Sequence, residues 1–184
     1  MKRTEQKDVR LIYDLVDVAI LPAALMILSK VLSITAINYF LGLDWSVRSV
    51  ANSVFSIGLV YNSAEDAVLV SSYSNLFMFV SVIAGCMVVT GKSLLLNHRR
   101  ASPYFVLKLA KYDLLHLLKS SFHIYKEAFV WTTFLIITTV YIFVSFLLGM
   151  TYGWVATMTL LFTLIFIWIM VQNIEEELLF NNYK

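Results

Sequence analysis

Charged residues are scarce in this chain. Asp, Glu, Lys and Arg make up 14% of its 184 residues, whereas soluble domains contain about 25%. Hydrophobic residues account for 60%, and the mean hydropathy is +0.79. This composition excludes an ordinary soluble domain and predicts an integral membrane protein. The formal net charge of +2 is too small to indicate a nucleic-acid partner.

Catalytic motifs and potential metal-binding residues are also few. Cys86 is the only cysteine, so the chain can form no intramolecular disulfide. The sequence has no G-x-S-x-G, no H-E-x-x-H, no P-loop and no dinucleotide-binding fingerprint. Zinc needs three or four converging ligands, but His116 and His123 share one helix face while Cys86 belongs to a different apolar run. We therefore expect no enzyme activity, no metal and no cofactor.

Long apolar runs are what the chain does have. A helix of about 20 apolar residues crosses a hydrocarbon core of about 30 Å, and four runs are long enough. The predicted organisation is a single membrane domain with an N-terminal arm (1–17), four spans (18–43, 67–91, 128–150 and 154–171), an external amphipathic segment (44–66), a basic segment (92–127) and an acidic tail (172–184). The fold class is all-α, with four transmembrane helices forming two hairpins joined by a cytoplasmic amphipathic helix.

The first span has two possible registers. In the preferred one it covers residues 18–43, residues 4–17 form a lead-in helix at the interface, and Pro22 begins or bends the span. In the other, the span starts near Val9, Asp14 and Asp17 lie inside the inner leaflet, and Lys30 extends toward the far interface. Both registers remain open.

Residues 44–66 are predicted to form a short amphipathic helix on the outer surface. Trp45 and Tyr61, two aromatic residues typical of membrane interfaces, bracket the segment. Apolar residues recur at helical spacing, namely Val47, Val50, Val54, Ile57 and Tyr61. A re-entrant segment is the alternative, and it requires its backbone to be shielded by protein.

The basic segment is predicted to form a helix that starts at Ser102 and Pro103, an N-cap and first-turn pair. One of its faces is apolar. The other face offers a surface for lipid headgroups or a partner, and Lys111 lies at its edge with the apolar face. The residues of this surface are Lys108, Lys111, Lys119, His123 and Lys126. We expect the acidic tail to extend the last helix.

Lysine and arginine are distributed unevenly around the spans. The N-terminal arm has 4, the region 92–126 has 7 and the tail has 1, whereas Arg48 stands alone in the other connecting segments. By the positive-inside rule, both termini and the basic segment are predicted to be cytoplasmic, in a plasma or inner membrane.

Lys30, Asn75 and Asp17 are the candidate intramembrane polar site. An ammonium near the bilayer centre costs about 2.5–3.5 kcal/mol, so Lys30 is expected to face a partner, an anionic substrate or a watery cavity, unless it reaches the interface. Asp17 lies 13 residues earlier in the sequence, which is about 20 Å along a helix, so it cannot pair with Lys30 there. Ser81 and Gly85 form a small-xxx-small pair suited to close helix packing.

Three functions are compatible with these features. The preferred one is a small non-catalytic subunit or scaffold of a larger membrane complex, whose partners are lipids and other membrane subunits rather than nucleic acid. The first alternative is an oligomeric transporter or channel that uses Lys30 and Asn75. The second is a membrane module that binds anionic lipid through its basic helix.

Overall fold

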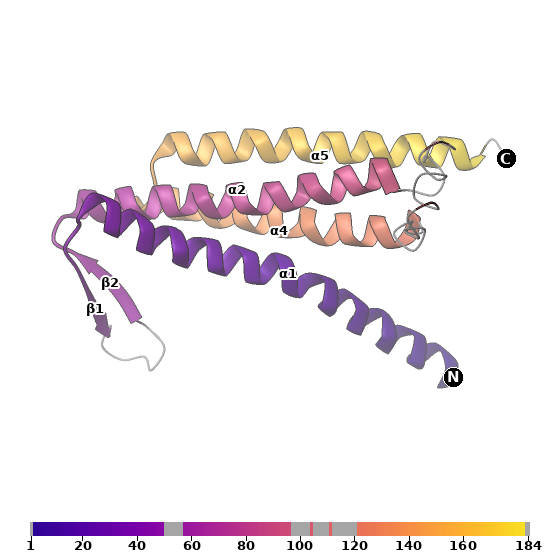
Figure 1. The fold of residues 1–184 in the computed structure, drawn as a ribbon, viewed down its shortest axis with the longest axis horizontal. Coiled ribbons are helices and arrows are strands. Elements are labelled where there is room, and N and C mark those ends of the chain that lie inside the picture. Colours follow the sequence, from indigo (N-terminus) through magenta and orange to yellow (C-terminus); the bar gives the residue numbers. More distant parts are fainter. Residues whose placement is uncertain (1, 50–56, 97–103, 105–110, 112–120, 183–184) are drawn as a thin grey trace. The chain divides into compact units, whose positions relative to one another are not determined.

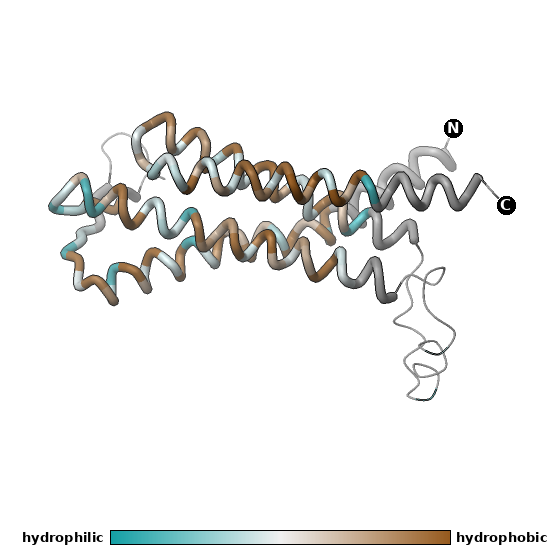
Figure 2. The backbone as a smooth tube through the Cα atoms, turned by 90° about the horizontal axis from the view of Figure 1, so that it is seen from above, coloured by the Kyte–Doolittle hydropathy of each residue, from teal (hydrophilic) through white to brown (hydrophobic). Residues whose placement is uncertain are grey.

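The computed structural model describes residues 2–49, 57–96, 104, 111 and 121–182 (Figure 1). Its elements are α1 (Lys2–Leu41), β1 (Trp45–Ser49), β2 (Ile57–Tyr61), α2 (Ala64–Leu96), α4 (Ser121–Leu147) and α5 (Gly153–Asn182). Each helix contains a stretch long and apolar enough to cross a membrane, and these are Val16–Leu41, Ala64–Gly91, Lys126–Leu147 and Gly153–Gln172. Hydrophobic residues dominate these stretches (Figure 2). The prediction of a mostly helical chain with four such helices is confirmed.

Helix α1 runs without interruption through the predicted arm and the predicted first span. Pro22 lies inside this helix, so the helix does not begin there. The stretch Val16–Leu41 of α1 has the length and apolarity of a span, close to the preferred register. At the other end of the chain α5 continues to Asn182, as expected for the tail.

The helix predicted for residues 44–66 is wrong. Strands β1 and β2 pair in an antiparallel hairpin, with Trp45 opposite Tyr61 (Figure 1). The chain is therefore mostly helical, with one two-stranded hairpin among its described residues. Residues 57, 59 and 61 are apolar or aromatic and share one face of a strand, while the i, i+4 pair Ile57 and Tyr61 fits both a helix and a strand. The β-branched and aromatic residues of the two strands favour the extended state.

Glycines end two of the helices. Gly42 after α1 and Gly149 after α4 have φ values of 60° and 72°, a left-handed conformation that glycine adopts without strain. The amide of Leu43 donates to the Asn38 carbonyl at 3.1 Å, and that of Met150 donates to the Ser145 carbonyl at 2.9 Å. This is the Schellman pattern of helix ends. It explains why α4 ends at Leu147, before the predicted limit of residue 150.

The chain divides into two compact units. Unit 1 comprises Met1–Met26 and Val80–Leu135, and unit 2 comprises Ile27–Phe79 and Ile136–Lys184. The described interior of unit 1 is mainly apolar and includes Val82, Cys86, Val89, Trp131 and Leu135. That of unit 2 also holds many buried hydroxyl and amide side chains, among them Ser72, Ser74, Asn75, Thr138, Thr151 and Thr159. Unit 2 therefore buries polar groups together with apolar ones, and it leaves many large apolar side chains on its surface.

Within unit 1, Gly85 of α2 lies against the indole ring of Trp131 of α4. A Cβ atom added at Gly85 would lie 1.9 Å from the ring atom Cζ3, far inside van der Waals contact. Trp131 is only 6% exposed, so its ring has little room to move. The Cys86 thiol also contacts the Trp131 carbonyl oxygen, at 3.5 Å. Glycine at position 85 thus permits the close approach of two helices.

We expect Gly85→Ala to destabilise the protein by about 1–3 kcal/mol, because the new methyl group overlaps the Trp131 ring. The matched control is Gly91→Ala in the same helix, where nothing lies within 4 Å of an added Cβ. That substitution should be neutral or stabilise by up to about 1 kcal/mol through helix propensity. Thermal unfolding in mild detergent measures both, and equal effects would contradict the packing argument.

Candidate polar site in unit 2

Lys30 of α1 is held by side chains from two other helices. Its ammonium donates a hydrogen bond to Asn75 Oδ1 of α2 at 3.0 Å and another to the Tyr141 hydroxyl of α4. The ammonium also lies 4.1 Å from the centroid of the Tyr141 ring, within cation–π range. The contacts therefore solvate a charge that would otherwise be costly among apolar helices.

Asn75 uses both ends of its amide. Its oxygen accepts from Lys30, and its Nδ2 donates to Thr151 Oγ1 at 2.9 Å. Asn75 is 0% exposed and Thr151 is 4% exposed. Because a buried amide without partners is costly, this double engagement fixes the orientation of the side chain. Asn75 consequently connects α1, α2 and the turn between α4 and α5.

A second contact joins the same turn to α2. The Tyr152 amide donates to Ser72 Oγ at 2.9 Å, and Ser72 is 0% exposed. Next to it, the rings of Tyr73 and Trp154 meet edge to face with centroids 6.3 Å apart. The turn thus rests on α2 at the level of Ser72 and Asn75.

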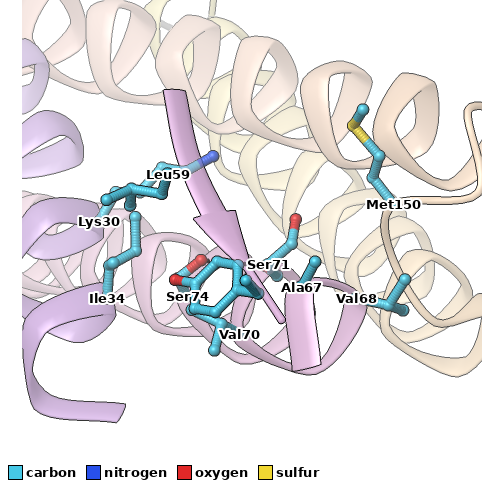
Figure 3. A pocket seen from close by; sticks show the side chains of 10 residues that line it. Lys30, Ile34, Leu59, Ala67, Val68, Val70, Ser71, Ser74 and Met150 are labelled. Carbon is cyan, nitrogen blue, oxygen red and sulfur yellow. Dashed lines mark hydrogen bonds between the residues drawn. The ribbon is translucent and has the colours of Figure 1, made fainter. Parts of the chain in front are cut away.

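A pocket of about 250 Å³ adjoins Lys30 (Figure 3). Its polar lining includes Lys30 from α1, Tyr61 from β2, and Ser71 and Ser74 from α2. The remaining wall is apolar and includes Ile34, Leu59, Val68, Val70 and Met150. The hairpin that replaces the predicted helix therefore supplies part of this wall, through Leu59 and Tyr61.

Asn38 lies beside this pocket on the same face of α1 as Lys30 and Ile34, at successive spacings of four residues. Its Nδ2 donates to the Tyr61 hydroxyl at 3.2 Å. Its Oδ1 is buried and has no hydrogen-bond partner, although the residue is only 4% exposed. Exchanging the two ends of the amide would leave the nitrogen unpaired instead, so one polar end of Asn38 stays unsatisfied in either orientation.

The third residue of the predicted site, Asp17, belongs to unit 1. There it lines a different pocket of about 640 Å³, together with Glu127, Trp131 and both residues of the small-xxx-small pair, Ser81 and Gly85. The structure thus brings Lys30 and Asn75 together and assigns Asp17 to another pocket.

The predicted basic face falls largely outside the described residues. Lys108 and Lys119 are not described, and of His123 only the helical backbone is described. Lys111 is exposed and Lys126 is half-buried at the start of the third candidate span. The apolar and polar faces of that segment remain a prediction.

Sequence reasoning did not find Tyr141, Thr151 or Ser72 as members of the site. Tyr141 lies among apolar residues, and Thr151 belongs to the short connection between two apolar runs, where nothing indicates a polar contact. Ser71, Ser72 and Ser74 precede Asn75 in an apolar run, a pattern that indicates a need for hydrogen-bond partners because unpaired polar groups are costly in a membrane. Nothing in the sequence indicated which partners these would be.

Comparisons with protein-family models, with curated proteins and with solved structures find no match for this chain. Within the part of the chain that the structure describes, no three His, Cys, Asp or Glu side chains gather as metal ligands would. The site is therefore interpreted from its own geometry, as a cation held by neutral hydrogen-bond acceptors next to a small and mostly apolar pocket.

A double-mutant cycle measures how strongly Lys30 depends on Asn75. Asn75→Leu should lower the free energy of unfolding by about 1–3 kcal/mol, because it leaves the Lys30 ammonium short of a partner. Lys30→Met combined with Asn75→Leu removes both members, so the double variant should be more stable than the sum of the single effects predicts. Unfolding in detergent micelles gives the coupling, expected near 0.6–1.7 kcal/mol. Strict additivity would mean that the hydrogen bond contributes nothing.

Proposed function

We propose that this protein is a small non-catalytic subunit or scaffold of a larger membrane assembly, and that α1 is the helix that meets the partner. The observation that carries this proposal is the sparse packing of α1. Only 11% of its candidate span is buried, against 39%, 39% and 33% for the candidate spans of α2, α4 and α5. A helix with so little intramolecular contact has the most surface left for another protein.

The exposed side of α1 is suited to helix packing. Within unit 2 three of its polar residues, Lys30, Ser33 and Asn38, are half-buried or buried, whereas Thr35 is exposed. Large apolar side chains point outward and follow helical spacing: Ile27, Leu28, Val31, Leu32, Tyr39 and Phe40. Two residues of this stripe, Tyr39 and Phe40, are each 82% exposed. Such a stripe can pack against a second helix by van der Waals contact, which drives helix association in lipid.

The proposed arrangement in the membrane is two hairpins joined on the cytoplasmic side. It rests on the positive-inside rule, with twelve basic residues in the termini and the 92–126 region against Arg48 in the β hairpin. Both termini and the basic segment are then cytoplasmic, in a plasma or inner membrane. The β hairpin and the α4–α5 turn lie on the opposite side.

Site-specific photocrosslinking in native membranes tests the subunit proposal. A photoreactive residue at Leu28 or Leu32, which are 59% and 66% exposed, should yield an adduct with the same protein at both positions. The matched control is Trp168 of α5, which is 65% exposed, and it should yield lipid adducts. If the two α1 positions gave lipid adducts alone, α1 would not be the docking helix and the proposal would fail.

A transporter or channel is the second candidate, favoured by the direct hydrogen bond between Lys30 and Asn75 beside a pocket. A polar pair of this kind can offer a transient site to an ion or an anionic substrate on its way through a membrane. The same hydrogen bonds also suit a residue pair that only holds the helices together, since both ends of the Asn75 amide are engaged.

Reconstitution into liposomes loaded with proton-, potassium- or chloride-sensitive dyes tests the transporter function. If Lys30 lines the path, Lys30→Met should abolish most of the flux, because the charge that attracts or repels the ion is removed. Lys111→Met, a change of the same chemistry at an exposed position, should leave it intact. Flux that persists unchanged in Lys30→Met would count decisively against this function.

A further inference from the structure

The positive charge of Lys30 has no countercharge in its described surroundings. The groups that contact its ammonium, the Asn75 amide oxygen and the Tyr141 hydroxyl and ring, are all neutral. Among the described residues that line the adjoining pocket there is no aspartate or glutamate. A half-buried cation without a countercharge attracts an anion more strongly than a fully hydrated one, because less water screens it.

The position of the pocket relative to the α4–α5 turn indicates its depth in the membrane. Non-helical backbone is not tolerated in contact with lipid tails, so this short turn between two uncharged spans marks a membrane surface. Thr151 and Tyr152 of the turn contact Asn75 and Ser72 of α2, and Met150 lines the pocket itself. The adjacent aromatic pair of Tyr73 and Trp154 is typical of the interface. Lys30 and the pocket therefore lie at headgroup level.

The β hairpin stands on the aqueous side of this level. Helix α2 begins at Ala64, and Ser72 and Asn75 follow about two to three turns later, or about 12–16 Å along the helix. Strand β2 precedes that first stretch of α2 and contributes Leu59 and Tyr61 to the pocket. Strand β2 thus lines the pocket from the headgroup side, and α1, α2 and the α4–α5 turn line the rest of it.

The lining of the pocket matches a phosphate ester attached to an apolar body. Lys30 supplies the charge, and the hydroxyls of Tyr61, Ser71 and Ser74 supply polar contacts. The volume of about 250 Å³ lies below the range of about 300–1,000 Å³ that is common for drug-sized ligands, so it suits a headgroup rather than a whole lipid. Apolar walls and exposed apolar helix surface accommodate the rest of the molecule.

We propose that this pocket binds the phosphate group of an anionic phosphate ester, with Lys30 as its countercharge and an anionic phospholipid of the leaflet on the hairpin side as its source. A lipid is favoured over a soluble ester because the site lies at headgroup level and most of its wall is apolar. An anionic headgroup is favoured over a zwitterionic one because no carboxylate of the described lining can pair with a second, cationic group. The buried, unpaired amide end of Asn38 provides one further polar group beside Tyr61.

The test uses the full-length protein in vesicles that contain phosphatidylglycerol with a photoreactive group in its headgroup. Adducts are mapped by mass spectrometry to the peptides that carry Leu59, Val68 and Met150, which separates this pocket from the basic segment 92–127. Phosphatidylglycerol should label these peptides about fivefold to tenfold more strongly than a phosphatidylcholine that carries the same photoreactive group. Equal labelling by the two lipids would overturn the proposal.

Two neighbouring residues of β2 provide a matched pair of variants that leave Lys30 and its hydrogen bonds untouched. Leu59 lines the pocket, whereas Val60 does not, since successive side chains of a strand point to opposite faces. They are 38% and 40% exposed, so both positions should tolerate a polar side chain. Leu59→Glu puts a negative charge in the pocket and should reduce labelling about fivefold to tenfold, while Val60→Glu should change it less than about twofold. Equal losses would also overturn the proposal.

A third variant and a competition experiment complete the test. Lys30→Arg keeps the charge and should retain most of the labelling, whereas Lys30→Gln should lose it. Equal labelling in these two variants would overturn the role of the charge.

Soluble glycerol phosphate distinguishes the two sources of the phosphate. Failure of glycerol phosphate to reduce labelling of the wild-type protein identifies the lipid headgroup as the ligand. Reduced labelling of the wild-type protein identifies a soluble ester at the same phosphate site and overturns the lipid as its source.

Discussion

An ammonium group among apolar helices has to be solvated by the protein, and the organisation of unit 2 follows from how this is done. Lys30 is half-buried, and its ammonium takes the Asn75 oxygen and the Tyr141 hydroxyl in place of part of its water shell. The Asn75 nitrogen then needs an acceptor of its own and finds it in Thr151. One half-buried charge thereby specifies contacts from α1, α2, α4 and the turn before α5. Each contact is short-range and directional, so together they fix the positions of these segments within the unit.

The same requirement explains the distribution of side chains in unit 2. Apolar residues cannot drive helices together in lipid, since the lipid tails are equally apolar, and the interior therefore relies on hydrogen bonds and small side chains. Thr139 and Thr163 join α4 to α5 through a 2.7 Å hydrogen bond, and both are buried. Large residues such as Phe40, Trp154 and Trp168 are exposed instead. In unit 1 the interior is apolar and close packing is provided by Gly85 against Trp131.

The β hairpin changes the interpretation of the segment between the first two long helices. An amphipathic helix there would cover a membrane surface, whereas a hairpin presents Leu59 and Tyr61 to the first turns of α2 and to Lys30. Tyr61 in turn receives the hydrogen bond of Asn38. The hairpin thus completes the pocket beside the Lys30 ammonium. Because of this pocket, the hydrogen-bonded cluster around Lys30 is also a candidate binding site.

The sequence by itself determined the class of protein and the four helices with the properties of spans, because length and apolarity are properties of contiguous residues. It also singled out Lys30 and Asn75, because polar groups inside apolar runs are costly wherever they lie. Only the tertiary structure decided that these two side chains bond to each other across 45 residues, and that Tyr141 and Thr151 join them across 111 and 76 residues. The choice between helix and strand for residues 57–61 was likewise not local, since spacing by four fits both periods and the contacts with α1 and α2 lie outside the segment. Hydrogen-bond partners depend on which segments the fold brings within about 3 Å of each other, and no local pattern in the chain encodes that.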